Sequence, residues 1–157
     1  AWCRNTLNSG SLAQPCRTAL SLVETRDAFD TLYTWLKARK DTAESVSPGN
    51  YAFRDEFKAI TPYADFHYAK ERYYALLFEV LGQDLRDPHA TGGIVRSMGS
   101  LKDTKRGLYI IRSTRSFYEA KWEKMEMQRS HKFLLAELNK MERTLSRRAK
   151  SRRKGSR

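Results

Sequence analysis

The chain has 157 residues and a net charge of +12, and 31% of its residues are charged, against about a quarter in an average soluble domain. One domain of this length can bury about two-thirds of its unfolded surface, so neither metal nor cofactor is needed for stability. The longest apolar run, at 73–81, is interrupted by Glu79 and is far below the roughly 20 residues that span a bilayer. We therefore expect no transmembrane helix, no cofactor, and a negatively charged partner.

The amino-terminal segment contains both cysteines, Cys3 and Cys16. An even pair that closes a short loop favours a disulfide, and two inert thiols are the alternative. No Cys/His cluster has the spacing of a zinc site, so no metal is expected. The chain begins at Ala1 rather than Met, as it would after removal of a secretory signal peptide, although a trimmed chain would begin in the same way.

Apolar residues recur with a helical period along most of the chain, and no segment shows the alternation of a strand. The first helix is predicted over 13–40, with Leu22, Phe29, Tyr33 and Leu36 on its core face. The segment "DTAESVSPGN" should end this helix. A short helical piece at 50–60 then stops at Pro62, which lacks a backbone donor.

The central part of the chain is predicted to form two more helices. The first, over 63–86, has an aromatic core face, and "DPHATGG" at 87–93 is predicted to be a loop. From residue 94 the apolar stripe moves round the helix after Gly107, which indicates a bend there. The second half should expose a charged face made of Arg112, Arg115, Glu119, Glu123 and Glu126.

The last helix has the clearest amphipathic pattern. Its apolar stripe consists of Leu134, Leu138, Met141 and Leu145, and its far side carries Lys132, Lys140, Arg143, Arg147 and Lys150. The chain then runs into "RRAKSRRKGSR", whose like charges favour disorder. We predict an all-α fold, an up-and-down bundle of four or five helices, with one domain over 1–150 and a disordered basic tail over 151–157.

Nothing in the sequence indicates catalysis, and we expect that the protein is not an enzyme. His67, His89 and His131 are scattered, without the spacing that metal binding or nucleophile activation needs. The glycines of "GGIVRSMGS" precede no Gly-Lys-Ser/Thr ending, so a phosphate-binding loop is not indicated.

The basic tail has several interpretations. It could serve solubility alone, or it could neutralise the phosphates of nucleic acid. Nucleic acid is not the expected partner, because most aromatic residues lie on core stripes and are unavailable for base stacking. A basic amphipathic helix could instead lie on an anionic membrane if it leaves the bundle.

Three segments resemble the sperm acrosomal proteins of abalone and related snails. In "AFDTLYTWLKARK" at 28–40, Phe29, Asp30, Leu32, Trp35 and Leu36 precede a basic helix end, as in the first long helix of the lysins. "YALLFEVLGQDLRDP" and "GGIVRSMGSLKDTKRGLYIIRSTRSFY" are similar to the second and third long helices of that family. The similarity extends over about residues 15–140.

The resemblance implies a secreted, basic, non-enzymatic five-helix protein of the sperm acrosomal vesicle. The mass of 18.3 kDa, the basic tail and the two cysteines are closer to the family's eighteen-kilodalton fusagenic branch than to the lysins. We therefore expect binding to anionic lipid of the egg membrane and promotion of sperm–egg fusion. Lysin-like dissolution of the egg vitelline envelope, through an envelope glycoprotein, is the alternative, and a ribosomal-type nucleic-acid-binding protein is the second alternative. A second copy of the chain, in a homodimer, is a further candidate partner.

The residues expected to carry this function fall into two groups. The apolar stripe of the last helix would be exposed if the bundle opened on contact with the membrane. The basic contacts with the egg surface are expected to be Lys37, Arg39, Lys40, Arg143, Arg147, Arg148, Lys150, Arg152, Arg153, Lys154 and Arg157.

Overall fold

A computed structural model describes residues 7, 13–40, 42, 52–82, 87–124 and 126–155. These residues form α-helices and two 3-10 helices, with no strand among them, which confirms the all-α class. The elements in chain order are α2 (Ala13–Val23), α3 (Arg26–Arg39), α5 (Ala52–Lys58), η1 (Thr61–Asp65), α6 (Lys70–Leu81), α7 (Pro88–Ser97), η2 (Met98–Ser100), α8 (Thr104–Trp122) and α9 (Arg129–Gly155).

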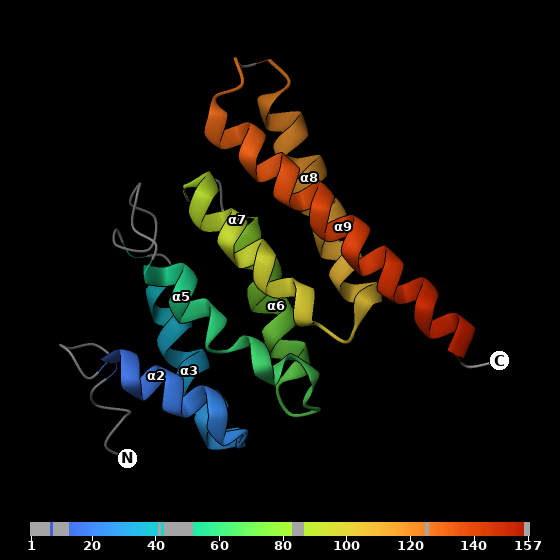
Figure 1. Cartoon of the computed structure of the whole chain (residues 1–157). Helices are drawn as coiled ribbons and strands as arrows, with labels where there is room; N and C mark the ends of the chain where they lie inside the picture. Colours follow the sequence, from blue (N-terminus) through green and yellow to red (C-terminus); the bar gives the residue numbers. More distant parts are fainter. Residues whose placement is uncertain are drawn as a thin grey trace.

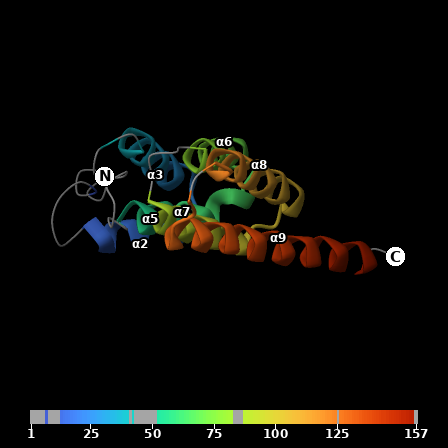
Figure 2. The ribbon, with the colours of Figure 1, turned by 90° about the horizontal axis from the view of Figure 1, so that it is seen from above.

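The two longest helices, α8 and α9, form an antiparallel pair, and α9 also packs along α7 (Figure 1). Helices α2, α3 and α5 lie together on the other side of the fold, and α5 contacts α7. The predicted up-and-down arrangement of four or five helices is not confirmed, since the described part of the chain is divided into more and shorter helices. The C-terminal turns of α9 reach beyond the other helices (Figure 2).

The predicted first helix over 13–40 is divided in two at Glu24. Glu24 has a φ of 53°, in the left-handed region that ends a helix. Thr25 then begins α3, because its side-chain oxygen accepts a hydrogen bond from the backbone N–H of Ala28 at 3.3 Å. As a result Leu22, predicted on the core face, is 75% exposed, whereas Phe29 and Leu36 are fully buried.

The predicted helix over 63–86 begins later than expected, and the predicted loop over 87–93 is helical. Residues 61–65 form the 3-10 helix η1, and α6 begins at Lys70. Asp87 caps α7, since its carboxylate accepts hydrogen bonds from the backbone N–H groups of His89 at 2.6 Å and Ala90 at 3.3 Å. Pro88 occupies the first turn, where a missing N–H costs nothing. These residues act as a helix start rather than as a turn.

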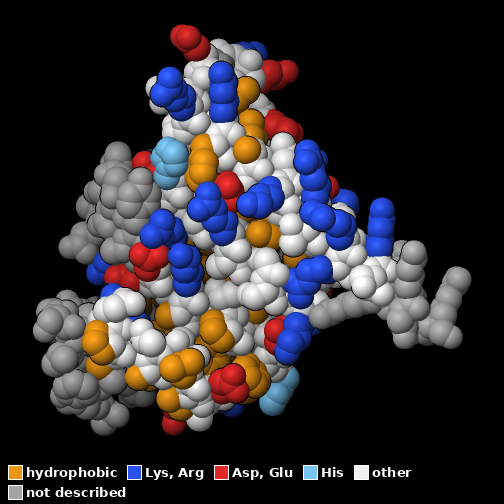
Figure 3. All heavy atoms as spheres, in the orientation of Figure 1, with side chains coloured by type: hydrophobic (Ala, Val, Ile, Leu, Met, Phe, Trp, Pro, Cys, Tyr) orange, Lys and Arg blue, Asp and Glu red, His pale blue; other side chains and the backbone are white. Residues whose placement is uncertain are grey.

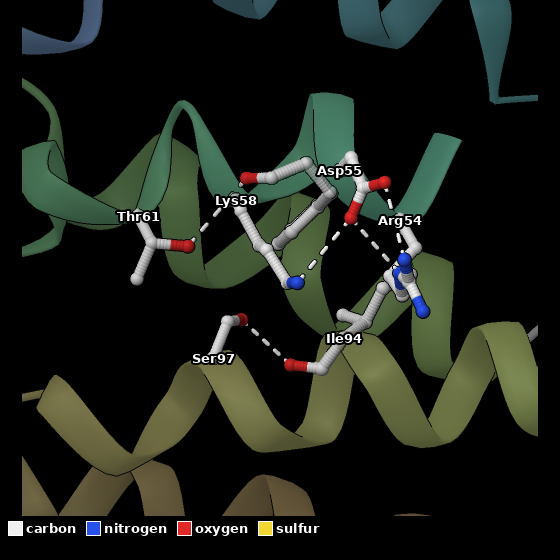
Figure 4. Close-up of polar contacts among 7 residues, drawn as sticks. Arg54, Asp55, Lys58, Thr61, Ile94 and Ser97 are labelled. Atoms are coloured by element: carbon white, nitrogen blue, oxygen red, sulfur yellow. Dashed lines mark hydrogen bonds and ion pairs between the residues drawn. The ribbon is translucent and has the colours of Figure 1, made fainter. Parts of the chain in front are cut away.

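Gly92 and Gly93 were predicted to lie in a loop but belong to α7. Because they have no side chain, α7 can approach its neighbours closely. A Cβ at Gly93 would lie 2.0 Å from Cδ of Arg54 in α5. Arg54 pairs with Asp55 at 2.9 Å, and Lys58 approaches the same carboxylate at 3.3 Å (Figure 4). The hydrogen bond from Arg54 holds the pKa of Asp55 below its usual range, with a further contribution from Lys58.

The bend predicted near Gly107 lies earlier, between η2 and α8. Asp103 begins α8 by accepting a hydrogen bond from the N–H of Arg106 at 3.1 Å. Gly107 is buried inside the continuous helix α8. The shift of the apolar stripe arises because α8 is a separate helix that packs in a different direction from α7.

The core is built mainly from α3, α5, η1, α6, α7, α8 and α9. Its fully buried side chains include Phe29, Leu32, Phe57, Tyr63, Tyr73, Leu77, Ile94, Leu134 and Leu138. Tilted aromatic contacts link α3 to η1, with ring centroids 5.6 Å apart for Phe29 and Tyr63, and α5 to α6, with centroids 6.0 Å apart for Phe57 and Tyr73. The phenol of Tyr68 donates to the carbonyl of Glu24 at 2.9 Å, which fastens the end of α2 to the segment after η1.

Candidate anionic-surface interface

The helix α9 presents two opposite faces, as predicted. Leu134, Leu138 and Leu145 have no exposed surface, and Met141 is 8% exposed. The apolar stripe of the sequence is therefore part of the core in this structure. The helix continues to Gly155, so the predicted disorder from residue 151 is not confirmed. Arg, Lys and Ala are good helix formers, and no Pro interrupts them before Gly155.

Both acidic residues of α9 face neighbouring helices. Glu137 accepts two hydrogen bonds from Arg96 of α7, at 2.7 Å from Nε and 3.0 Å from Nη2. Glu142 accepts a hydrogen bond from Nε of Arg112 of α8 at 2.8 Å and another from Arg115. These hydrogen bonds hold the pKa of each glutamate below its usual range. Arg112 and Arg115, predicted on a solvated face of their helix, therefore turn toward α9.

The cations of α9 lie on the opposite side. We define the basic face of α9 as Lys132, Lys140, Arg143, Arg147 and Lys150. All five side chains are exposed, and none forms an ion pair with a described residue. Ala136, Asn139, Lys140, Arg143 and Arg147 line a shallow depression of about 350 Å³ along this face. Figure 3 shows Lys and Arg side chains gathered over α9 and the neighbouring α7.

The helix geometry makes the basic face a straight row. Residues spaced by three or four positions lie above one another on a helix, and from Lys132 to Lys150 the row is about 27 Å long at about 1.5 Å per residue. The two glutamates of α9 form their ion pairs with arginines of α7 and α8 and not with this row, although Glu137 is close enough to Lys140 for a weaker electrostatic interaction. The row therefore presents a field of one sign to solvent.

Two predicted contact residues have structural roles instead. Arg39 pairs with the buried Glu56 at 3.1 Å, and its guanidinium lies over the ring of Trp35. Lys40 is 8% exposed and its ammonium lies 2.7 Å from Glu79. Periodicity placed both at a basic helix end, but it could not show that carboxylates from α5 and α6 meet them. Lys37 remains exposed, 5.9 Å from the ring centroid of Tyr33.

The other predicted contacts lie toward the end of the chain. Arg148 is half-buried and donates to the backbone carbonyl of Gly99, which ties α9 to η2. Arg152, Arg153 and Lys154 belong to the helical part of α9, and their side chains lie outside the described part of the structure. Arg157 and Cys3 also lie outside the described residues, so the predicted Cys3–Cys16 disulfide remains a prediction. Cys16 itself is buried.

The histidines pack against aromatic rings. His131 stacks on Trp122 with centroids 4.1 Å apart, His89 lies against Phe133 at 4.5 Å, and His67 meets Tyr68 edge-on. Among the described residues, no group of three or more His, Cys, Asp or Glu side chains could hold a metal ion. Within the same part of the chain, no helix has the length and apolar character needed to cross a bilayer.

One surface feature has no counterpart among the predicted site residues. Phe78 of α6 is 47% exposed and Tyr109 of α8 is 65% exposed, and their rings stack with centroids 6.2 Å apart and an interplanar angle of 16°. Phe78 lies beside the core stripe of α6 and Tyr109 lies opposite the core stripe of α8, so a helical wheel could have marked both as outward-facing. Only the fold shows that they form a pair.

A scan against models of protein families gave no match, and searches of curated proteins and of solved structures gave none either.

Proposed function

We propose that this protein binds an anionic surface without catalysis, through the basic face of α9. The observation that carries the proposal is the separation of charge on α9. Its two glutamates are engaged by arginines of α7 and α8, while five cations face solvent and form no ion pair with a described residue. A row of this kind attracts a polyanion at long range and binds it at short range.

We further propose that the anionic surface is the egg membrane and that the protein promotes sperm–egg fusion. The support is the sequence resemblance to the acrosomal proteins, from which we also propose a secreted protein stored in the sperm acrosomal vesicle. Each Lys or Arg near an anionic leaflet contributes about 1 kcal/mol. The five residues of the basic face would together contribute several kcal/mol at low salt, and less as salt screens them.

Fusion also requires apolar contact with the bilayer. The apolar stripe of α9 could supply this contact only at a large cost in free energy. Exposing Leu134, Leu138, Met141 and Leu145 would cost about 1.5–3 kcal/mol for each side chain. The ion pairs of Glu137 and Glu142 would have to break as well. The total is comparable with the about 5–15 kcal/mol that stabilises a whole domain. Opening of α9 is therefore the costly part of this proposal.

Vesicle binding by charge-reversal variants tests the proposal. Arg143→Glu/Arg147→Glu should abolish binding to vesicles that contain phosphatidylserine, and it should abolish lipid mixing between them. Arg26→Glu/Lys124→Glu is the matched control, since both residues are exposed and the net charge falls equally. Equal loss in the two variants would show that only net charge matters and would contradict a specific role for the basic face.

Isolated egg envelopes and nucleic acid provide the competing outcomes. Dissolution of envelopes by a protein that does not mix lipids would replace the fusion proposal with the lysin-like function. Tight, salt-dependent binding to RNA without vesicle binding would favour the ribosomal-type alternative.

A further inference from the structure

We infer that the closed fold already carries an apolar bilayer contact, formed by Phe78 and Tyr109 at the rim of a groove that takes the headgroup of an anionic phospholipid. This inference rests on the proposed function, because it assumes that the partner is a membrane. It adds the site of apolar contact and the class of lipid that would occupy it. It also removes the need for α9 to leave the core.

The aromatic pair is accessible without any rearrangement. Tyr109 is 65% exposed and Phe78 is 47% exposed, so both rings present apolar surface to water. They stack on each other across α6 and α8, with centroids 6.2 Å apart. Aromatic side chains at a bilayer surface prefer the boundary between headgroups and acyl chains. The pair has the composition and the exposure of an interfacial anchor.

The groove beside Tyr109 brings this pair next to the end of α9. It has a volume of about 770 Å³, and its lining includes Lys105, Leu108 and Tyr109 of α8 together with Ala149 of α9. Ala149 directly precedes Lys150, the last residue of the basic face. Because consecutive residues of a helix point about 100° apart, Ala149 lies on the side of α9 that faces α8, and the basic face lies round the helix from it. The groove and its own cations are therefore a site separate from the basic face.

The chemistry of the groove suits a phosphate ester. Lys105 is exposed and pairs with no carboxylate of a described residue. Arg112 is 58% exposed and contributes a second cation, although Glu142 engages its Nε. Ser113 adds a hydroxyl donor, and no described residue that lines the groove is acidic. Two cations and a hydroxyl donor thus line the groove together with Tyr109, so a phosphate ester bound there would gain charge-assisted hydrogen bonds beside the aromatic pair.

The experiment compares two double variants of the full chain on vesicles of phosphatidylcholine and phosphatidylserine. Phe78→Ala/Tyr109→Ala removes the proposed anchor. Leu22→Ala/Val23→Ala is the control, since these residues are 75% and 54% exposed at the end of α2. We expect Phe78→Ala/Tyr109→Ala to weaken partitioning about tenfold through lost apolar area. Phe78→Ala/Tyr109→Ala should also lose its vesicle binding at high salt, whereas the wild type and the control variant should retain part of their vesicle binding. Thermal unfolding of each variant verifies the fold.

A fluorescence measurement locates the contact directly. Tyr109→Trp should show more quenching by lipids brominated on the acyl chains than wild type does, whereas Leu22→Trp should show no increase. Lys105→Glu should weaken binding to phosphatidylserine vesicles more than the control Lys124→Glu.

Several results would overturn the inference. If wild type binds vesicles and Phe78→Ala/Tyr109→Ala binds equally at both salt concentrations, the anchor does not exist and the charge-based function survives. If wild type binds no vesicles, the proposed function itself fails. If Phe78→Ala/Tyr109→Ala loses binding to a sulfated polysaccharide but not to vesicles, the groove belongs to a glycan and not to a lipid.

Discussion

Gly92 of α7 lies against the edge of the Phe133 ring of α9, so that a Cβ at residue 92 would be 2.7 Å from Cε1 of Phe133. Non-bonded carbon atoms normally stay about 3.5–4.0 Å apart. The contact is possible only because residue 92 has no side chain. It sets how closely α7 and α9 approach each other, and therefore how the basic face of α9 is held on the fold.

Gly92→Ala should destabilise the protein. Displacing the Phe133 ring should cost about 1–3 kcal/mol, offset in part by up to about 1 kcal/mol of helix propensity. Gly99→Ala is the control, since a Cβ there would lie 3.5 Å from Cε of Met141, an ordinary contact distance. Urea unfolding measures both variants. If Gly92→Ala were as stable as the wild type, α7 and α9 would be less closely packed than the 2.7 Å approach implies.

Glu24→Gly should stabilise the protein by about 1 kcal/mol. Glu24 has a φ of 53°, a conformation that costs a residue with a Cβ about 1–2 kcal/mol and costs glycine little. Glu24→Gln keeps the Cβ and removes the charge, so it should leave the melting temperature near that of wild type. An equal rise of melting temperature in both variants would assign the effect to charge.

Leu138→Ala and Lys140→Ala should separate stability from binding. Leu138 is fully buried, so its truncation should cost about 2–5 kcal/mol. Lys140 is exposed on the basic face, so its truncation should change stability by less than about 0.5 kcal/mol while weakening binding to anionic vesicles. Denaturant unfolding and vesicle co-sedimentation check the pair. Stronger fusion by folded Leu138→Ala would support opening of α9.

Stability should fall in acid because of the two glutamates of α9. Their pKa values lie below the usual 4.5 in the folded protein, so folding is favoured while they are ionised. This stabilisation is fully present above about pH 4.5 and is lost as the pH falls through the lowered folded pKa values. Because Arg96 and Arg112 are more than half exposed, the contribution of each pair is about 1 kcal/mol.

The variant Glu137→Gln/Glu142→Gln provides the measurement. Its free energy of unfolding should be lower than that of wild type at pH 7, and the difference should shrink between pH 5 and pH 3. The exposed Glu126→Gln is the control and should follow the wild-type pH profile. A constant difference at all pH values would show that the two carboxylates contribute by packing and not by charge.

Local sequence patterns predicted the helical class and the faces of α9, because both depend on periodicity within one segment. The sequence also contains the residues that begin the helices, but their surroundings favoured other predictions. Asp87 and Pro88 form a helix start, yet the Pro and glycines nearby favoured a loop. Thr25 is a capping residue, yet an apolar pattern that continues through it favoured one long helix.

The sequence by itself determined that this protein is helical and strongly basic, and that its last helix has one apolar and one basic side, since these properties follow from composition and from residues three or four positions apart. Only the tertiary structure decided which charges remain available. Arg39 and Lys40 meet Glu56 and Glu79 across 17 and 39 positions, and Phe78 meets Tyr109 across two helices. Such contacts depend on how the helices pack against one another, and the pattern of residues within one segment does not determine that packing.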